Sequence, residues 1–140
     1  MSLFDKLMAV DDSKVREKKT KTVHSERLSK LLGIETSITI EALPFRLVRK
    51  YLDSAMKDNG RMDSDRHVDS MCHLIRLSVK EIPWGDPELQ RKFGASDPKD
   101  LVEKMLDSDI GKISDEVVVI SGYGDDAEES EAELEENVKN

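Results

Sequence analysis

The sequence predicts a mainly α protein: a compact helical domain with a small N-terminal β element, either a hairpin or edge strands, and an acidic, mobile C-terminal tail. Three observations predict this fold class. Apolar residues recur at helical spacing between Phe45 and Ile120. Alternating β-branched residues, which indicate strands, form two short runs before residue 41. Nearly all of the excess negative charge follows residue 124.

The chain has 140 residues, the length of one domain, and the sequence divides it into three parts. Residues 1–21 are predicted to form a flexible, partly basic N-terminal arm, residues 22–124 the mainly helical domain, and residues 125–140 the acidic tail. The basic residues of the arm are Lys14, Arg16, Lys18, Lys19 and Lys21. They favour a flexible arm over a nucleic-acid contact, because no recognition helix or aromatic stacking platform accompanies them.

Two short runs indicate the β element. Ile38-Thr39-Ile40 alternates β-branched residues, and the run from Thr20 to Val23 repeats this pattern more weakly. Such alternation is typical of a strand with one buried face. We therefore expect a small hairpin or an edge strand ahead of the helices.

Two longer helices are predicted next. The first presents one apolar face from Phe45 to Met56, with Pro44 at its start and Asn59-Gly60 at its end. The second runs from about Asp65 to Val79 and carries the widest apolar stripe. It must end before Pro83, because a proline disfavours helical geometry in the preceding residue. We expect this second helix to be the most buried one.

Asp86-Pro87 and Asp97-Pro98 each predict the start of a short helix. Proline fits the first helical turn, where no backbone N–H is needed, and the preceding aspartate can accept from the free N–H groups. Gly94 suits the left-handed conformation past the end of the first of these helices. The second has an apolar stripe at Leu101, Val102, Met105 and Leu106. Helices this short need packing against longer elements, because helix nucleation is costly in water.

The apolar run from Ile110 to Ile120 permits two structures. Ile110, Ile113, Val117 and Ile120 fit a helical period, whereas the four residues VVVI would suit a strand equally well. We favour a helix that ends at Ser121-Gly122.

The tail holds most of the net charge. Eight acidic residues against Lys139 give −7 of the −8 carried by the whole chain. The only apolar residues between 125 and 140 are Ala127, Ala132, Leu134 and Val138. They are too few to bury a face, so we expect the tail to be exposed until a partner binds it. It either solubilises the protein or serves as a docking segment.

The sequence offers no catalytic or metal-binding constellation. His67 and His73 are six residues apart, so on one helix they would lie on nearly opposite faces. The Gly-Asp-Asp at 124–126 resembles a polymerase motif, but two-metal chemistry needs further carboxylates in a much larger domain. We predict no enzyme, no metal and no cofactor. Cys72 is interpreted as a small buried hydrophobic residue.

No apolar run approaches the 18 or so residues of a membrane span, and no hydrophobic signal segment begins the sequence. We therefore expect a soluble, unsecreted protein that contacts neither a membrane nor nucleic acid.

The segment from Asp86 to Asn140 resembles the C-terminal half of the phage tail assembly chaperones of the XkdN-like group. The shared features are Glu88-Leu89-Gln90, the Phe93-Gly94 corner, Leu101 with Met105-Leu106, Ser121-Gly122-Tyr123, and Glu135-Glu136 with Lys139-Asn140. The resemblance covers the last 55 or so residues well and the rest of the chain loosely. Trp84 departs from the pattern, since the family more usually has an Asn- or Asp-rich step there, and the basic arm has no counterpart.

The resemblance implies a non-enzymatic role. Such chaperones bind the long, mostly helical tape measure protein and keep it soluble until tail tube subunits displace them. The implied partners are the tape measure protein and the tail tube protein, with weak self-association as a further expectation. The implied location is the cytoplasm of the host cell, outside the mature virion. A helical body with apolar grooves would suit a helical partner.

Eight residues are predicted to bind a partner: Trp84, Asp125, Asp126, Glu128, Glu129, Glu131, Glu135 and Glu136. Trp84 has two interpretations, a lid that finishes the core or a partner hot spot. An alternative function for the whole chain is that of an acidic regulatory protein or nucleic-acid mimic, whose tail engages a basic surface.

Overall fold

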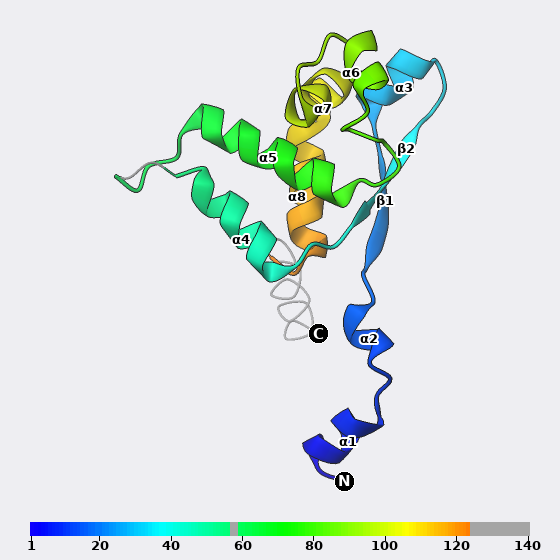
Figure 1. The fold of residues 1–140 in the computed structure, drawn as a ribbon, viewed down its shortest axis with the longest axis vertical. Coiled ribbons are helices and arrows are strands. Elements are labelled where there is room, and N and C mark those ends of the chain that lie inside the picture. Colours follow the sequence, from blue (N-terminus) through cyan, green and yellow to red (C-terminus); the bar gives the residue numbers. More distant parts are fainter. Residues whose placement is uncertain (57–58, 124–140) are drawn as a thin grey trace, which may run out of the picture.

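The computed structural model describes residues 1–56 and 59–123. Within them, helices pack beside one small antiparallel sheet at the edge of the body, which confirms the mainly α fold class with a small N-terminal β element (Figure 1). The predicted acidic tail at 125–140 lies outside the described residues. No helix of the described part is long and apolar enough to cross a membrane.

The sheet consists of β1 (Thr20–His24) and β2 (Ser37–Glu41), paired antiparallel with Val23 opposite Ile38. Val23, Ile38 and Ile40 are buried, as the alternation predicts. The strands are joined through a helix, α3 (Glu26–Leu32), which the sequence analysis did not predict. Ser25 caps the start of α3 by accepting from the Leu28 N–H, and Gly33 ends it at a φ of 71°.

The helices α4 (Phe45–Ser54) and α5 (Ser64–Ser78) form an antiparallel pair. The start of α4 and the extent of α5 agree with prediction, but the end of α4 at Asn59-Gly60 was wrong. The helix stops at Ser54 because the backbone then turns toward α5. The Asp63 N–H donates to the Ala55 carbonyl at 2.9 Å, and Met56 forms a β-bridge with Met62. Among the described helices, α5 has the most buried residues, as expected.

Both predicted short helices are present, as α6 (Pro87–Lys92) and α7 (Pro98–Leu106). Asp86 accepts from the N–H groups of Glu88 and Leu89, and Asp97 accepts from that of Asp100. Gly94 has a φ of 68°, the left-handed conformation predicted there. A 3₁₀ turn (Asp107–Asp109) links α7 to α8 (Ile110–Ile120), which is the predicted helix and not a strand.

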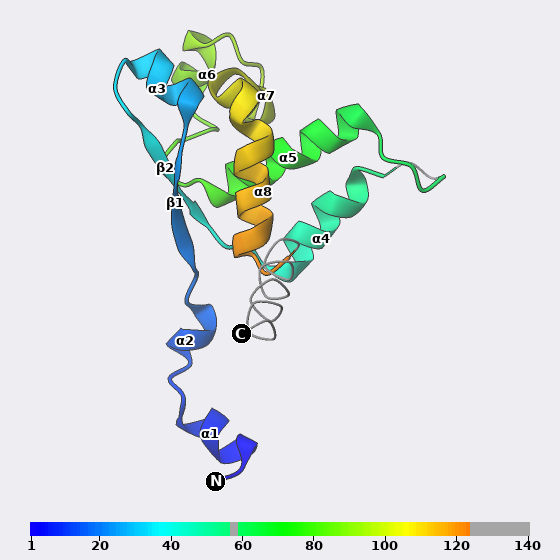
Figure 2. The ribbon, with the colours of Figure 1, turned by 180° about the vertical axis from the view of Figure 1, so that it is seen from behind.

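The core lies where α8 meets the sheet, α5 and α7. In both views α8 crosses α5, and the end of α5 reaches the sheet (Figures 1 and 2). Helix α8 has its buried residues Ile110, Ile113 and Val117 on one face, which decides for helix over strand. The opposing fully buried side chains include Leu74, Ile75, Leu101 and Leu106.

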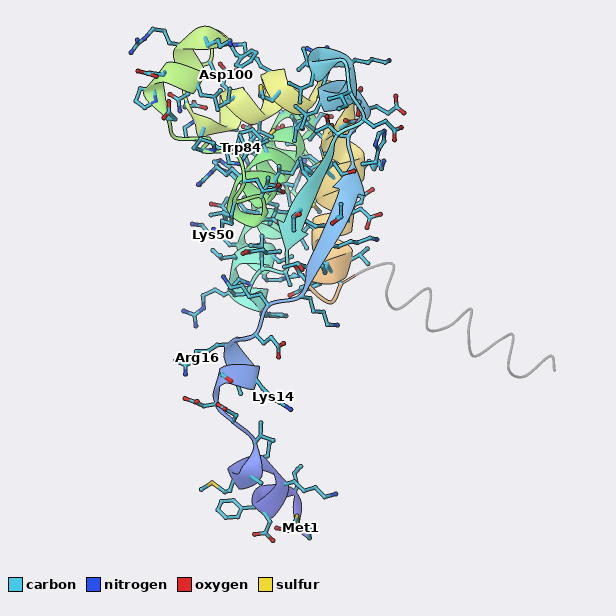
Figure 3. The ribbon with its side chains drawn as sticks, turned by 90° about the vertical axis from the view of Figure 1, so that its right-hand side faces the viewer. Met1, Lys14, Arg16, Lys50, Trp84 and Asp100 are labelled. Atoms are coloured by element: carbon cyan, nitrogen blue, oxygen red, sulfur yellow. The ribbon has the colours of Figure 1, made fainter. Side chains whose placement is uncertain are left out.

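The N-terminal arm carries two short helices, α1 (Leu3–Ala9) and α2 (Ser13–Arg16), and extends away from the body (Figures 1 and 3). Every residue from 1 to 22 is exposed. The last two residues of the predicted arm, Thr20 and Lys21, already belong to β1. The basic residues of the arm therefore lie on exposed backbone that leads directly into the sheet.

Candidate partner-binding surfaces

Trp84 lies in the core, with 5% of its surface exposed. Its indole N–H donates to the Val79 carbonyl at 3.1 Å, and its own carbonyl accepts from the Gln90 side-chain amide at 2.8 Å. These contacts tie the segment after α5 to α6, as expected of a side chain that finishes the core. A direct contact between Trp84 and a partner stays a prediction. The seven predicted acidic residues lie outside the described residues.

An apolar groove, which no single stretch of sequence indicates, opens between α3, β2, α6 and α7. It has a volume of about 480 Å³. Its apolar lining includes Leu28, Leu31, Leu32, Ile38, Phe93 and Met105. Leu32 is 63% exposed, Leu31 46% and Phe93 37%, so large apolar side chains border an opening to solvent. Grooves of this composition suit the apolar face of a helix.

A buried carboxylate holds α3 against the body and thereby fixes one wall of the apolar groove. Asp109 accepts from the Ser25 hydroxyl at 2.7 Å and from the Arg27 N–H at 2.9 Å. Hydrogen bonds to a charged acceptor are stronger than neutral ones. The residues that follow α3 are fixed as well, because the Thr36 N–H donates to the Ser29 hydroxyl at 2.9 Å. Leu31 and Leu32 are thus presented on an anchored helix.

The rim of the apolar groove carries one acid and one cation. A carboxylate oxygen of Glu81 accepts from the Thr39 N–H on β2. The Lys92 ammonium lies 5.9 Å from the centre of the Phe93 ring, within range of a cation–π interaction. Apolar side chains make up most of the lining, so the groove suits an uncharged helix face.

A second apolar surface lies on α1. Leu3, Phe4, Leu7 and Met8 occupy one helical face, and each is between 63% and 72% exposed. The helix is well started, since the Ser2 hydroxyl accepts from the Asp5 N–H and Asp5 accepts from the Ser2 N–H in return. This face has no covering element among the described residues.

A larger and more polar cavity of about 780 Å³ lies between α5, α7 and the start of α8. Its charged lining includes Arg27, Asp100 and Lys104. The Lys104 ammonium donates to Asp100 at 2.9 Å and to the Gly94 carbonyl at 2.7 Å, and the first of these bonds lowers the pKa of the Asp100 carboxyl. These bonds join α7 to the corner before it.

Cys72 and His73 on α5 both pack against other parts of the fold. Cys72 is buried, which confirms the interpretation as a small hydrophobic residue, and burial raises the pKa of its thiol to about 12. The His73 ring stacks on Tyr51 at 5.0 Å and accepts from Arg76 at 3.0 Å. Burial, followed by the Arg76 charge, lowers the pKa of His73. In residues 1–56 and 59–123, no three His, Cys, Asp or Glu side chains gather as a metal site requires.

The chain was compared with known proteins. The crystal structure of the protein YqbN, a structural genomics target, has a similar fold, with a TM-score of 0.52 and 12% sequence identity. The similarity covers 76% of this chain and 88% of YqbN. A search of curated proteins finds no match. The model of the phage XkdN-like tail assembly chaperone proteins matches residues 4–139, which is almost the entire sequence. The chain therefore belongs to the family of phage XkdN-like tail assembly chaperones.

Proposed function

We propose that this chaperone binds the tape measure protein, keeps it soluble during tail assembly and helps to recruit tail tube subunits. The observation that carries the proposal is the apolar groove between α3, β2, α6 and α7 in a member of a tail assembly chaperone family. A chaperone for a long helical protein needs a surface that covers apolar helix faces. The groove has that character.

The size of the apolar groove suits a short helical segment and not a whole domain. Side chains at positions i, i+3, i+4 and i+7 of a helix form one stripe, and a groove of this kind binds side chains of that stripe. Each such contact is weak, so a long partner would be covered by many copies of the chaperone that bind in parallel. Weak individual contacts also allow release when tail tube subunits arrive.

The acidic residues Asp125, Asp126, Glu128, Glu129, Glu131, Glu135 and Glu136 are proposed to provide a second contact, with the tape measure or the tail tube protein. Their charge would also keep the complex soluble. Trp84 would support binding by holding α6, which borders the groove, in place. This role places the chaperone in the host cytoplasm and outside the finished virion.

Substitution at the rim of the apolar groove tests the proposal. Leu32→Asp places a charge at a side chain that is 63% exposed, so folding is retained while an apolar partner is opposed. We expect co-expressed tape measure protein to shift from the soluble to the insoluble fraction, and its co-purification with the chaperone to fall roughly tenfold or more, the effect of about 1.4 kcal/mol.

The matched control is Ile34→Asp. Ile34 is 68% exposed and lies two residues beyond Leu32, but it does not line the apolar groove. This variant has the same change in charge and a similar loss of exposed apolar surface. Equal losses in the two variants would contradict the groove as the binding site. Undiminished solubility of the tape measure protein in cells without any chaperone would contradict the function itself.

A further inference from the structure

A cavity of about 720 Å³ lies where the N-terminal arm meets the body. Its lining includes Arg16, Lys18 and Lys19 from the arm, and Leu43, Pro44 and Ile120 from the body. It therefore has one basic wall and one apolar wall. This site is separate from the apolar groove, which is lined by α3, β2, α6 and α7.

The described part of the chain neutralises the positive charge of the arm only in part. Residues 14–21 contain five cations against Glu17, a net charge of +4. Lys18 lies 3.9 Å from Glu41, Arg16 pairs with its helical neighbour Asp12 at 2.9 Å, and Lys21 pairs with Glu116 on α8 at 2.5 Å. Lys19 makes no ion pair within residues 1–56 and 59–123. In Figure 3, Lys14 and Arg16 project to opposite sides of the arm, so its positive charge surrounds the backbone.

The chain leaves the described region at the edge of this same cavity. Ser121 and Gly122 line it directly. The Ser121 hydroxyl accepts from the Leu43 N–H at 2.9 Å and donates to the Val117 carbonyl at 2.7 Å. The Tyr123 ring stacks on Phe45 with 5.7 Å between the ring centres. These contacts fix the point from which residues 124–140 begin.

We propose that the acidic tail of the free chaperone binds the basic arm of the same molecule across this cavity. The tail carries a charge of −7, and residues 14–21 carry a formal charge of +4 that Asp12, Glu41 and Glu116 offset only in part. The tail also contains Leu134 and Val138, which the apolar wall of Leu43, Pro44 and Ile120 would accommodate. The charge of the basic wall and the apolar character of the other wall therefore both favour the tail as the segment that binds in this cavity.

Because the tail and the arm belong to one chain, weak contacts are sufficient to hold them together. Each exposed ion pair contributes only about 0.2–1 kcal/mol. A short tether, however, provides an effective concentration on the order of millimolar, so even a weak intrinsic affinity populates the bound form. The 17 residues after Tyr123 span up to roughly 55–60 Å when extended, which is ample to follow the arm.

The contact would couple two binding segments. A partner that takes the tail must release the arm, and a partner that takes the arm must release the tail, by the same factor in affinity. The free chaperone would thus cover both segments until a tail protein displaces one of them. The inference concerns the free chain and stands whether or not the tape measure protein is the partner.

Paramagnetic relaxation in the full chain tests the contact. A nitroxide on Ala132→Cys labels the tail selectively and keeps Leu134 and Val138 in place, because Cys72 is buried and its thiol pKa is about 12. We expect broadening of the amide signals of Val15 to Lys19 at about 20 mM salt, and a fall of roughly threefold or more at about 500 mM, where charges are strongly screened. Absence of broadening at low salt would overturn the proposal.

A pair of charge reversals in the labelled chain identifies the site. Lys18→Glu with Lys19→Glu reverses two lysines of the basic wall, and the broadening at Val15 to Lys19 should disappear. Lys30→Glu with Lys80→Glu makes the same change in net charge at two exposed lysines outside the cavity, and the broadening should remain. Equal effects of both pairs would reduce the contact to non-specific attraction and refute the assigned site.

A mixed sample separates the tail of the same molecule from that of a second copy. Nitroxide-labelled chains without ¹⁵N are combined with unlabelled ¹⁵N chains, so that broadening reports only contacts between molecules. We expect no broadening of the arm signals in this mixture. Broadening equal to that in the single labelled chain would assign the tail to a neighbouring copy and overturn the intramolecular proposal.

Discussion

The helices α1 and α7 carry the same apolar pattern, but the apolar face of α1 is exposed and that of α7 is buried. In α1 the pattern is Leu3, Phe4, Leu7 and Met8, and in α7 it is Leu101, Val102, Met105 and Leu106. Both have positions i, i+1, i+4 and i+5, and both begin with a side-chain cap. Yet the α1 side chains are largely exposed, whereas Leu101, Val102 and Leu106 have no exposed surface.

The comparison shows that local signals set where a helix begins and which face is apolar, but not what covers that face. Helix α7 is covered because the 3₁₀ turn and α8 fold back beside it and because α5 packs across it. Helix α1 precedes a long exposed arm that separates it from the body. A helix of seven residues is marginal in water, so the stability of the described fold should reside in elements such as α7.

The largest expected effect comes from removing the same side chain in the two helices. Leu101→Ala creates a cavity in the core and should lower the free energy of unfolding by about 2–5 kcal/mol. Leu7→Ala removes a side chain that is 63% exposed and should change it by less than about 0.5 kcal/mol. Urea denaturation of both variants measures the difference. Similar losses would mean that α1 is packed in solution and would break the comparison.

Carboxylates offer a second, smaller contrast. Asp109 is 6% exposed and accepts from both Ser25 and Arg27, so Asp109→Ala leaves two donors without their acceptor. The expected cost is about 1–3 kcal/mol. Asp5→Ala also removes an accepted backbone hydrogen bond, but in the exposed α1. It should leave the urea midpoint unchanged, because water satisfies the freed N–H group.

Asp109→Asn sharpens this contrast. The amide oxygen is able to accept both hydrogen bonds, so only the added strength of the charged acceptor is lost. Asp109→Asn should lower the free energy of unfolding relative to the wild type, but by less than Asp109→Ala does. A cost equal to that of Asp109→Ala would show that the negative charge, and not the hydrogen-bond geometry, holds α3 in place.

The predictable parts of the fold were those with local signals. Asp86-Pro87, Asp97-Pro98 and Gly94 each act on their own backbone, so the positions of α6 and α7 followed from sequence. Helix α3 was missed because, of its seven residues, only Leu28 is buried, which leaves too short an apolar pattern. The end of α4 was misplaced because it depends on the bridge between Met56 and Met62, which the apolar pattern of the helix does not indicate.

The apolar groove could not be predicted, because its walls come from distant parts of the sequence. Leu31 and Met105 lie more than 70 residues apart, and the helix that carries Leu31 is held to the body by Asp109. Trp84 was named as a partner candidate, although its place beside Pro83 and a capped corner favoured a lid over the core, and it is buried. Residue type alone does not separate these two uses.

The smallest contrast compares two ion pairs. The Lys99 ammonium on α7 lies 2.9 Å from Asp69 on α5, with 31% and 45% of their side-chain surfaces exposed. Arg16 and Asp12 on the arm are equally close, at 2.9 Å, but are 75% and 84% exposed. The hydrogen bond from Lys99 to Asp69, opposed by partial burial, raises the pKa of the Lys99 ammonium. The first pair joins two packed helices, whereas the second joins neighbours in one exposed segment.

Double-mutant cycles with Lys99→Met and Asp69→Asn, and with Arg16→Met and Asp12→Asn, measure the two couplings. For the first pair we expect a coupling of about 0.2–1 kcal/mol, which declines as salt screens the charges. For Arg16 and Asp12 we expect no coupling energy. Both lie on the exposed arm, so unfolding of the body does not separate them. A coupling in the arm pair equal to that of Lys99 and Asp69 would show that the arm folds cooperatively with the body. The contrast between α1 and α7 would then hold only for exposure and not for stability.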